Sequence, residues 1–199
     1  MSVDMETVKK LREQTGIGIL ECKKALAEAN GDIKKAVEIL RKKGYEKAKS
    51  KSSRATNQGV IGSYVHTNSK IGVIVEVACE TDFVAKNEDF LQFVKDVAMQ
   101  IAAMNPQYVS AQDIPEDVLK KEKEIFAEQL KKSGKPENII EKIVEGKLKK
   151  LYSEICLMDQ AFFKDDKNTI AALLTEKIHK IGENLVIKRF VRYQVGEDI

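Results

Sequence analysis

The sequence predicts an α+β fold: a small helical bundle, then a three-stranded antiparallel sheet with helices on one face. Short helical repeats of apolar residues fill positions 1–45. Two strand-like runs, 59–66 and 71–79, flank a short polar connection, and a third run, 184–195, comes much later. Helical patterns occupy the sequence between the second and third runs. The first two strands are neighbours in the sequence and the third is separated from them by helices, which favours a mixed class over an all-β one.

Size and composition are those of a globular protein. The chain has 199 residues, 43% of them hydrophobic and 33% charged, which is enough to bury a core in one large or two small domains. The formal net charge of +3 is too small to predict nucleic-acid binding over the whole surface. No apolar run approaches the roughly 18 residues that span a bilayer, and the N-terminus lacks a signal-peptide pattern, so we expect no membrane association.

The cysteines predict neither a disulfide framework nor a metal site. Cys22, Cys79 and Cys156 are far apart, and no metal-binding spacing joins them to each other or to His66 and His179. We therefore expect buried or inert thiols in a reducing cytoplasm, with no metal and no cofactor. Pairing of one cysteine between two chains stays open at this point.

The first module, residues 1–45, contains three short helical patterns. Apolar residues recur at helical spacing in 4–14, in 19–29 and after Asp32, which is placed to cap the third helix. Gly44 is expected to close that helix. The residues expected to face inward are Met5, Val8, Leu11, Ile19, Cys22, Ala25, Leu26, Ala29, Ile33, Ala36, Val37 and Leu40.

A bundle of this size predicts a surface role and not a catalytic pocket. Its core is thin, because some 45 residues are near the lower limit for independent folding. The run GIGIL at 16–20 places apolar side chains at a glycine-rich turn, which suits a contact patch for a partner helix. The alternative is that all of these side chains belong to the bundle core.

Residues 41–54 are strongly basic, with interleaved serines and few apolar residues. This composition indicates a solvated linker or a helix extension, and we place the linker at 46–58, before a core domain at 59–199. An RNA- or ribosome-associated protein acting through this segment is the alternative function, although Tyr45 is the only aromatic near it that could stack on bases. The basic residues are Arg41, Lys42, Lys43, Lys47, Lys49, Lys51 and Arg54.

The core domain should combine the sheet with several helices. The segment 67–70 is the expected hairpin connection. Amphipathic helices are expected at 87–104, in a helical hairpin at about 115–154, and at 168–180. With helices on one face, the other face of the sheet is left for solvent or another subunit.

One corner concentrates candidate functional residues. Asp82 and Phe83 stand side by side where the second strand gives way to a helix, and such corners often carry function. Residue chemistry alone favours a buried Phe83 with Asp82 as a turn cap. An enzyme using Asp82 or Glu80 with His66 as acid and base is a further alternative, but it requires a pocket that the sequence does not indicate.

Nine short segments along essentially the whole chain form a recognisable series. They are LREQTGIG at 11–18, CKKAL at 22–26, EANGD at 28–32, GSYVH at 62–66, TDFVAKN at 81–87, SGKP at 133–136, VEGK at 144–147, GEN at 182–184 and RFVR at 189–192. In this order they resemble bacterial elongation factor Ts. One departure is that the family usually has alanine at the position of Ile17 and often methionine at those of Ile19 and Leu20. Another is that longer members carry a duplicated core and an extra C-terminal helix, whereas this chain resembles the short members with one copy.

The resemblance implies a function without a catalytic residue. It implies a guanine-nucleotide exchange factor for the GTPase elongation factor Tu, with an N-terminal module of the ubiquitin-associated type and homodimerisation through the core sheet. No enzyme activity of its own and no direct nucleic-acid binding are expected. Localisation in the cytoplasm follows from the same resemblance.

The resemblance also implies site residues. The segment Thr81, Asp82, Phe83 and Val84 matches the part that enters the GTPase near its magnesium and phosphate site, which favours an exposed Phe83 with Val84 as the inward anchor. A second set matches the contact of the N-terminal module and one core contact. These residues are Arg12, Ile19, Leu20 and His66.

Overall fold

The computed structural model describes residues 4–131 and 137–197. Contacts between residues divide the chain into two compact units. The domain boundaries expected at residues 45 and 59 divide the chain into modules that would fold separately, and this division stays a prediction. The first unit comprises Met1–Val60, Val77–Val94 and Ala172–Val186, and the second comprises Ile61–Glu76, Lys95–Ala171 and Ile187–Ile199.

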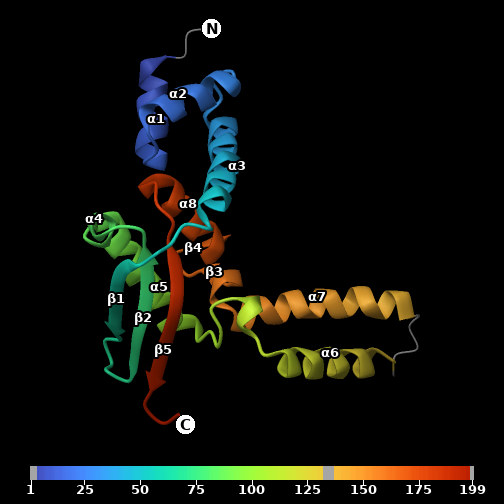
Figure 1. Cartoon of the computed structure of the whole chain (residues 1–199). Helices are drawn as coiled ribbons and strands as arrows, with labels where there is room; N and C mark the ends of the chain where they lie inside the picture. Colours follow the sequence, from blue (N-terminus) through green and yellow to red (C-terminus); the bar gives the residue numbers. More distant parts are fainter. Residues whose placement is uncertain (1–3, 132–136, 198–199) are drawn as a thin grey trace. The chain divides into compact units, whose positions relative to one another are not determined.

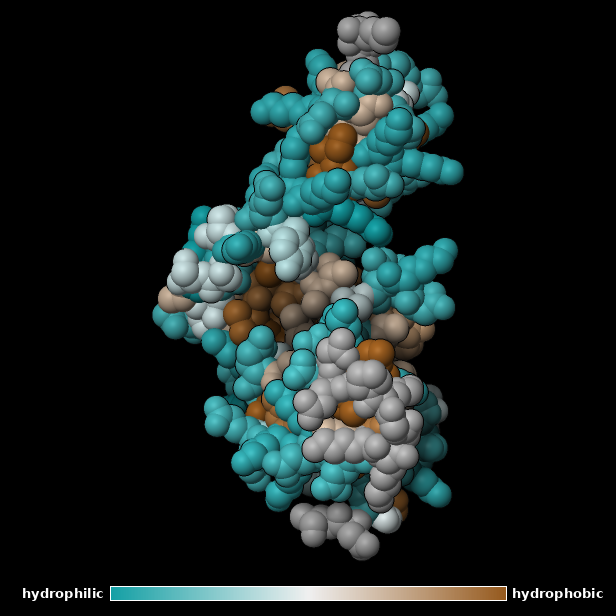
Figure 2. All heavy atoms as spheres, turned by 90° about the vertical axis from the view of Figure 1, so that its right-hand side faces the viewer, coloured by the Kyte–Doolittle hydropathy of each residue, from teal (hydrophilic) through white to brown (hydrophobic). Residues whose placement is uncertain are grey.

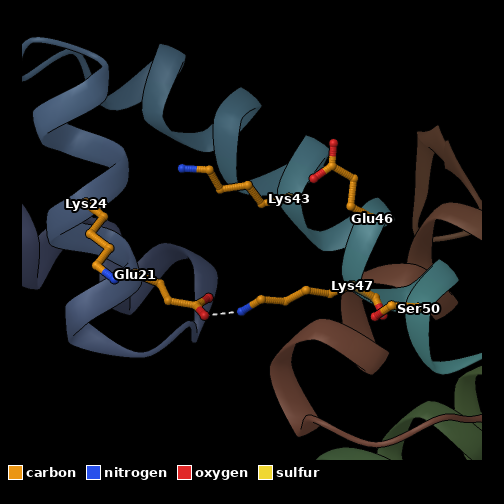
Figure 3. Close-up of a pocket in the computed structure, with 6 residues that line it drawn as sticks. All are labelled: Glu21, Lys24, Lys43, Glu46, Lys47 and Ser50. Atoms are coloured by element: carbon orange, nitrogen blue, oxygen red, sulfur yellow. Dashed lines mark hydrogen bonds and ion pairs between the residues drawn. The ribbon is translucent and has the colours of Figure 1, made fainter.

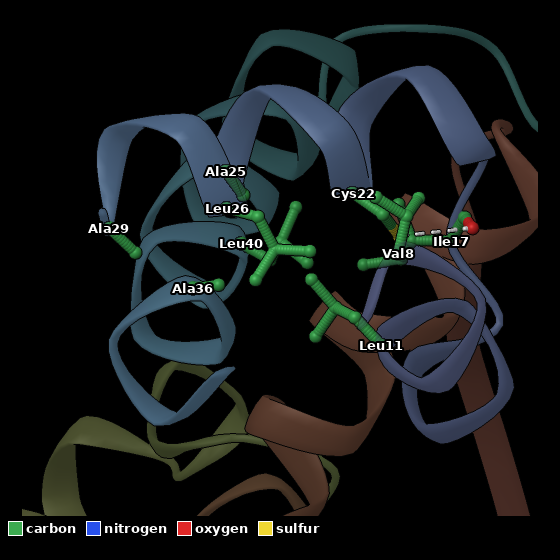
Figure 4. Packing of buried hydrophobic residues seen from close by; sticks show 9 residues of the cluster. All are labelled: Val8, Leu11, Ile17, Cys22, Ala25, Leu26, Ala29, Ala36 and Leu40. Atoms are coloured by element: carbon green, nitrogen blue, oxygen red, sulfur yellow. Dashed lines mark hydrogen bonds between the residues drawn. The ribbon is translucent and has the colours of Figure 1, made fainter. Parts of the chain in front are cut away.

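Three helices at the N-terminal end form the expected bundle: α1 (Met5–Thr15), α2 (Ile19–Glu28) and α3 (Ile33–Lys51). Their apolar stripes meet in one core cluster, part of which is seen in Figure 4. The predicted cap is confirmed, because the Asp32 carboxylate accepts hydrogen bonds from the backbone N–H groups of two residues in the first turn of α3. The buried cluster comprises Val8, Leu11, Ile17, Cys22, Ala25, Leu26, Ala29, Ala36 and Leu40.

Two of the predicted inner residues are exposed, and that part of the prediction is wrong. Met5 is 50% exposed and Ile19 is 36% exposed. Each is the first residue of its helix. Helical side chains point toward the N-terminus, so a residue at the first position extends beyond the helix and not onto a neighbouring one.

Helix α3 does not end at Gly44, as the sequence suggested, but continues to Lys51. Of the two interpretations of the basic segment, the helix extension is the one observed, and only residues 52–57 separate α3 from the sheet. Gly44 is buried, and a Cβ atom added there would lie 2.9 Å from Nδ1 of His179 in helix α8 (Ile170–Ile181). The glycine therefore leaves space for an imidazole ring and does not terminate the helix.

The predicted three-stranded antiparallel sheet is confirmed. Its strands are β1 (Gln58–Val65), β2 (Ile71–Cys79) and β5 (Val186–Gln194), and β2 is the central strand, as Figure 1 shows. Burial alternates along β2, because Val73, Val75 and Val77 are buried whereas Ile74 is 49% exposed. The alternation gives the sheet one covered face and one open face.

Helices make up most of the remaining described residues. The pair α6 (Glu116–Lys131) and α7 (Glu137–Ile155) lies side by side as the expected helical hairpin, seen in Figure 1. The motif SGKP at 133–136 lies outside the described residues. A short hairpin of β3 (Ala161–Phe162) and β4 (Asp165–Thr169) is not expected from the sequence. The other elements are α4 (Asp82–Ala85), α5 (Glu88–Met104), η1 (Ala111–Asp113) and η2 (Leu157–Asp159).

The surface and the thiols agree with the composition. The face seen in Figure 2 is mostly hydrophilic, with a few separate apolar patches. Within the described ranges, no helix has the length and apolar character that crossing a membrane requires. Cys22, Cys79 and Cys156 are all unpaired and buried, and desolvation raises the pKa of Cys156 to about 11.

Candidate partner-binding site

The corner after β2 is a tightly capped turn. Thr81 has an extended backbone and caps the four-residue helix α4, with its Oγ1 accepting a 3.4 Å hydrogen bond from the backbone N–H of Val84. Helix α5 starts three residues after α4 ends, and the Asn87 side chain caps it by accepting from the N–H groups of Asp89, at 2.8 Å, and Phe90, at 3.3 Å. Two successive caps thus fix the backbone on both sides of residues 82–85.

The side chains of this corner divide between solvent and interior. Phe83 is 82% exposed, the highest value among the exposed large hydrophobic residues that the structure describes. Val84 is half-buried, which agrees with its expected role as the inward anchor. An aromatic ring so exposed on a fixed turn is unusual, since such rings contribute most to stability when they are buried.

Asp82 carries a fixed negative charge beside this ring. The Lys86 ammonium lies 2.9 Å from its carboxylate, one helical turn away. That hydrogen bond from Lys86 lowers the pKa of Asp82, so the carboxylate is ionised at neutral pH. Both side chains are largely exposed, with side-chain accessibilities of 54% for Asp82 and 77% for Lys86, so either can exchange this contact for one to a partner.

The N-terminal candidates gather at the turn between α1 and α2. Gly16 ends α1 in the left-handed conformation, with φ of 65°, and its N–H donates to the carbonyl of Arg12 at 2.7 Å. The apolar run then divides, because Ile17 is buried in the bundle whereas Ile19 and Leu20 are 36% and 71% exposed. A shallow depression of about 440 Å³ lies at this turn and is lined by Lys9, Arg12, Glu13, Gly16 and Ile19.

The groups of the alternative acid–base interpretation have other partners. His66, in the second unit, is half-buried, with its Nδ1 3.0 Å from the hydroxyl of Tyr64. The Glu80 carboxylate accepts from the backbone N–H of Asn184 at 2.6 Å. Among residues 4–131 and 137–197, no group of three or more His, Cys, Asp or Glu could hold a metal ion. The Glu80 carboxylate is therefore engaged in a contact between distant segments, and His66 in one with a neighbouring residue of the hairpin.

Several basic residues of segment 41–54 also have structural partners. Lys47 pairs with Glu21 of α2, as Figure 3 shows at a groove of about 370 Å³, and Lys43 lies 2.5 Å from Glu28. Lys51 donates to the carbonyl of Gly182. These contacts give the segment a role in fastening α3 to its neighbours, and the expectation of no direct nucleic-acid binding stays a prediction.

Sequence reasoning missed one residue at the corner. Glu183 belongs to the GEN motif but was not among the candidate site residues, and its carboxylate accepts hydrogen bonds from Glu80 and Thr81. The two segments are 102 residues apart or more, so no local pattern could pair them. The only available signal was that both GEN and TDFVAKN carry the family resemblance.

Comparison with known proteins gives consistent matches over the whole chain. The family model described as "Elongation factor TS" matches residues 3–197. An Elongation factor Ts from Thermosipho melanesiensis is 54% identical over 98% of this chain and 100% of its own length. Those from Solidesulfovibrio magneticus and Geobacter sulfurreducens are 56% and 52% identical over 99% and 100% of this chain, and over 98% and 92% of their own lengths. The chain belongs to the elongation factor Ts family.

Proposed function

We propose that this chain acts in translation elongation as the guanine-nucleotide exchange factor of elongation factor Tu, promoting GDP release by disturbing the Mg²⁺ and phosphate site. The observation that carries the proposal is the 82% exposed Phe83 on a turn capped at both ends. A rigid exposed ring can insert into a partner with little loss of conformational entropy, which favours tight binding. The names of the relatives support a role in elongation.

Exchange of this kind needs no acid, base or metal from the factor. A protein that binds the nucleotide-free GTPase more tightly than the nucleotide-bound form must weaken nucleotide binding by the same factor. Only contacts that differ between the two forms contribute. Phe83 supplies apolar area for such a contact, and the ionised Asp82 supplies hydrogen-bond acceptors beside it.

A second contact supports the proposal. On the first unit, Arg12 and the 36% exposed Ile19 line the same depression, and Leu20, the residue after Ile19, is 71% exposed. Such a surface suits the apolar stripe and acidic residues of an amphipathic helix. Ile19 and Leu20 are not members of the buried apolar cluster of the bundle, to which Ile17 belongs.

The proposal is tested by GDP release. Elongation factor Tu is loaded with a fluorescent GDP analogue and mixed with excess unlabelled GDP, with and without this chain. We expect the chain to accelerate release strongly at millimolar Mg²⁺ and to add much less when EDTA has already removed the metal. Failure of the wild-type chain to accelerate release at any Mg²⁺ concentration would contradict the proposal.

We further propose that two copies of the chain associate through the open face of the sheet. The Arg189 guanidinium lies 2.7 Å from the Glu76 carboxylate, which places alternate residues of β5 on the same face as Ile74. The hairpin bond from His66 N–H to the Ile71 carbonyl, 2.9 Å, adds alternate residues of β1 to that face. Its exposed apolar residues are Ile61, Val65, Ile74, Val191 and Tyr193.

A second copy is the occupant that best fits this face. The chain has one copy of the core, whereas longer family members have two. Its resemblance to the short members implies that a second chain supplies the other copy. Light scattering after size exclusion should give twice the mass of 22.4 kDa for the wild-type chain. Ile74→Lys should shift the mass toward one copy, whereas Lys188→Glu, on the opposite face of β5, should not. A single-copy mass for the wild-type chain at every concentration would overturn the dimer.

A further inference from the structure

A carboxylate from a distant segment holds the corner that carries Phe83. Glu183 lies in the turn between α8 and β5. Its Oε2 accepts from the backbone N–H groups of Glu80, at 3.1 Å, and Thr81, at 3.0 Å. Its Oε1 accepts from the hydroxyl of Thr81 at 2.7 Å. All three donors belong to the two residues directly before Asp82.

The attachment is reciprocal. The Glu80 carboxylate accepts from the backbone N–H of Asn184 at 2.6 Å and lies 3.4 Å from the Arg54 guanidinium. The Asn184 side chain, 3% exposed as a residue, donates to the carbonyl of Arg54 at 3.0 Å. Backbone N–H groups of each segment thus donate to a carboxylate of the other, and Arg54 contacts both the Glu80 carboxylate and the Asn184 side chain.

The geometry at Thr81 links this attachment to the helix that bears Phe83. A threonine hydroxyl has one proton to donate and lone pairs to accept with. Because the proton goes to Glu183, a lone pair is left to accept the Val84 N–H that caps α4. Glu183 therefore fixes both the backbone before α4 and the orientation of the hydroxyl that caps it.

We infer that Glu183 is a positioning residue for nucleotide exchange, which holds the corner so that Phe83 is presented in one direction. This inference deepens the proposed function and rests on it. Glu183 is half-buried beneath the corner and acts through Thr81, so it need not touch the partner. Losing it should leave Phe83 chemically intact but only part of the time in the competent orientation.

That role has a kinetic signature. When only a fraction of the molecules is competent, the apparent affinity falls by that fraction, whereas the bound complex is unchanged. Glu183→Ala should raise the concentration of this chain that gives half-maximal GDP release by about tenfold, if the competent fraction falls to about one tenth. The maximal release rate at saturation should stay near that of the wild-type chain.

The conservative variant separates positioning from charge. In Glu183→Gln, the amide oxygen can still accept both backbone N–H groups, but the amide NH₂ group meets the Thr81 hydroxyl, so we expect a shift of about threefold. Glu176→Gln, at an exposed position on α8, is the matched control and should shift nothing. Equal half-saturation for the Ala, Gln and control variants, in a protein that does accelerate release, would overturn the inference. If the Ala variant does not fold, the Gln variant decides.

A measurement without the partner keeps the inference independent of the proposed function. The chain has no tryptophan, so Phe83→Trp places a single indole reporter at the corner. We expect high time-resolved anisotropy for Phe83→Trp alone and a larger fast-decaying amplitude when Glu183→Ala is added. An unchanged decay would overturn the positioning role. A changed decay, in a chain that fails to release GDP, would retain Glu183 as the holder of Phe83 and reject only the proposed function.

Discussion

Replacing Phe83 by alanine should abolish much of the exchange activity without weakening the fold. An aromatic side chain buries about 150–250 Å² when it enters a partner, and Phe83 has 82% of its area available. At about 25 cal/mol per Å² this corresponds to about 4 kcal/mol. Alanine retains a small part of the contact, so we expect a loss of about 2–3 kcal/mol, or about 30- to 150-fold in the second-order rate constant of stimulated GDP release.

The stability of the variant is the second half of this prediction. Because Phe83 is so exposed in the free chain, Phe83→Ala should change the free energy of unfolding by no more than about 0.5 kcal/mol. Leu91→Ala, at an apolar residue of α5 that is 44% exposed, is the matched control and should retain exchange. GDP release over a range of subsaturating concentrations of the chain gives the second-order rate constant, and thermal unfolding by circular dichroism gives the stability. Wild-type release by Phe83→Ala, or a large loss of stability, would refute the reasoning.

Three further variants test the fold and its second contact. Gly59→Ala should destabilise the chain by about 3 kcal/mol or more, since φ is 149° and the new Cβ would collide with the carbonyl of Val77 and lie 2.7 Å from Cα of Ala78. Gly72→Ala, where the added Cβ meets open space, is the control and should not destabilise the chain; urea unfolding measures both. Hydrogen bonds from Lys47 and then His179 lower the pKa of Glu21 in the folded chain. The contribution of Glu21 to folding stability is therefore present above its unfolded pKa near 4.5 and is lost as pH falls through the folded value. Glu21→Gln should show a flatter decline of melting temperature from pH 5 to pH 3 than the wild-type chain, and an identical decline would contradict this. Leu20→Ala should weaken elongation factor Tu binding by about 1 kcal/mol, roughly fivefold, at unchanged melting temperature, and unchanged affinity in calorimetry would count against the N-terminal contact.

The elements that repeat a pattern over several turns or residues could be predicted from the sequence. The bundle stripes, the Asp32 cap and the alternation of β2 all depend on neighbours within a few positions. The corner itself, TDFVAKN, was identified from its place between a strand and a helix. Whether Phe83 faces solvent depended on the resemblance, because residue chemistry alone favoured burial.

Features set by distant contacts could not be predicted. A glycine at position 44 is typical of a helix end. In the structure its lack of a side chain instead leaves room for His179 of α8, a residue of the same unit that is 135 positions later in the sequence. The hairpin of β3 and β4 is too short and too polar to show alternation, with only two residues in β3. Glu183 is tied to the corner across more than 100 residues, and no periodicity reports such a pair.

The buried thiols make the chain convenient for site-specific labelling. A pKa of about 11 leaves only about one Cys156 side chain in ten thousand as thiolate at pH 7, and Cys22 and Cys79 are equally shielded from solvent. Maleimide dyes react with accessible thiolates, so a cysteine introduced on the surface should be modified long before the native three. A donor and an acceptor dye could then be attached at chosen positions of the two units without removing any native cysteine. Single-molecule energy transfer would report whether the distance between the two dyes changes when elongation factor Tu is added.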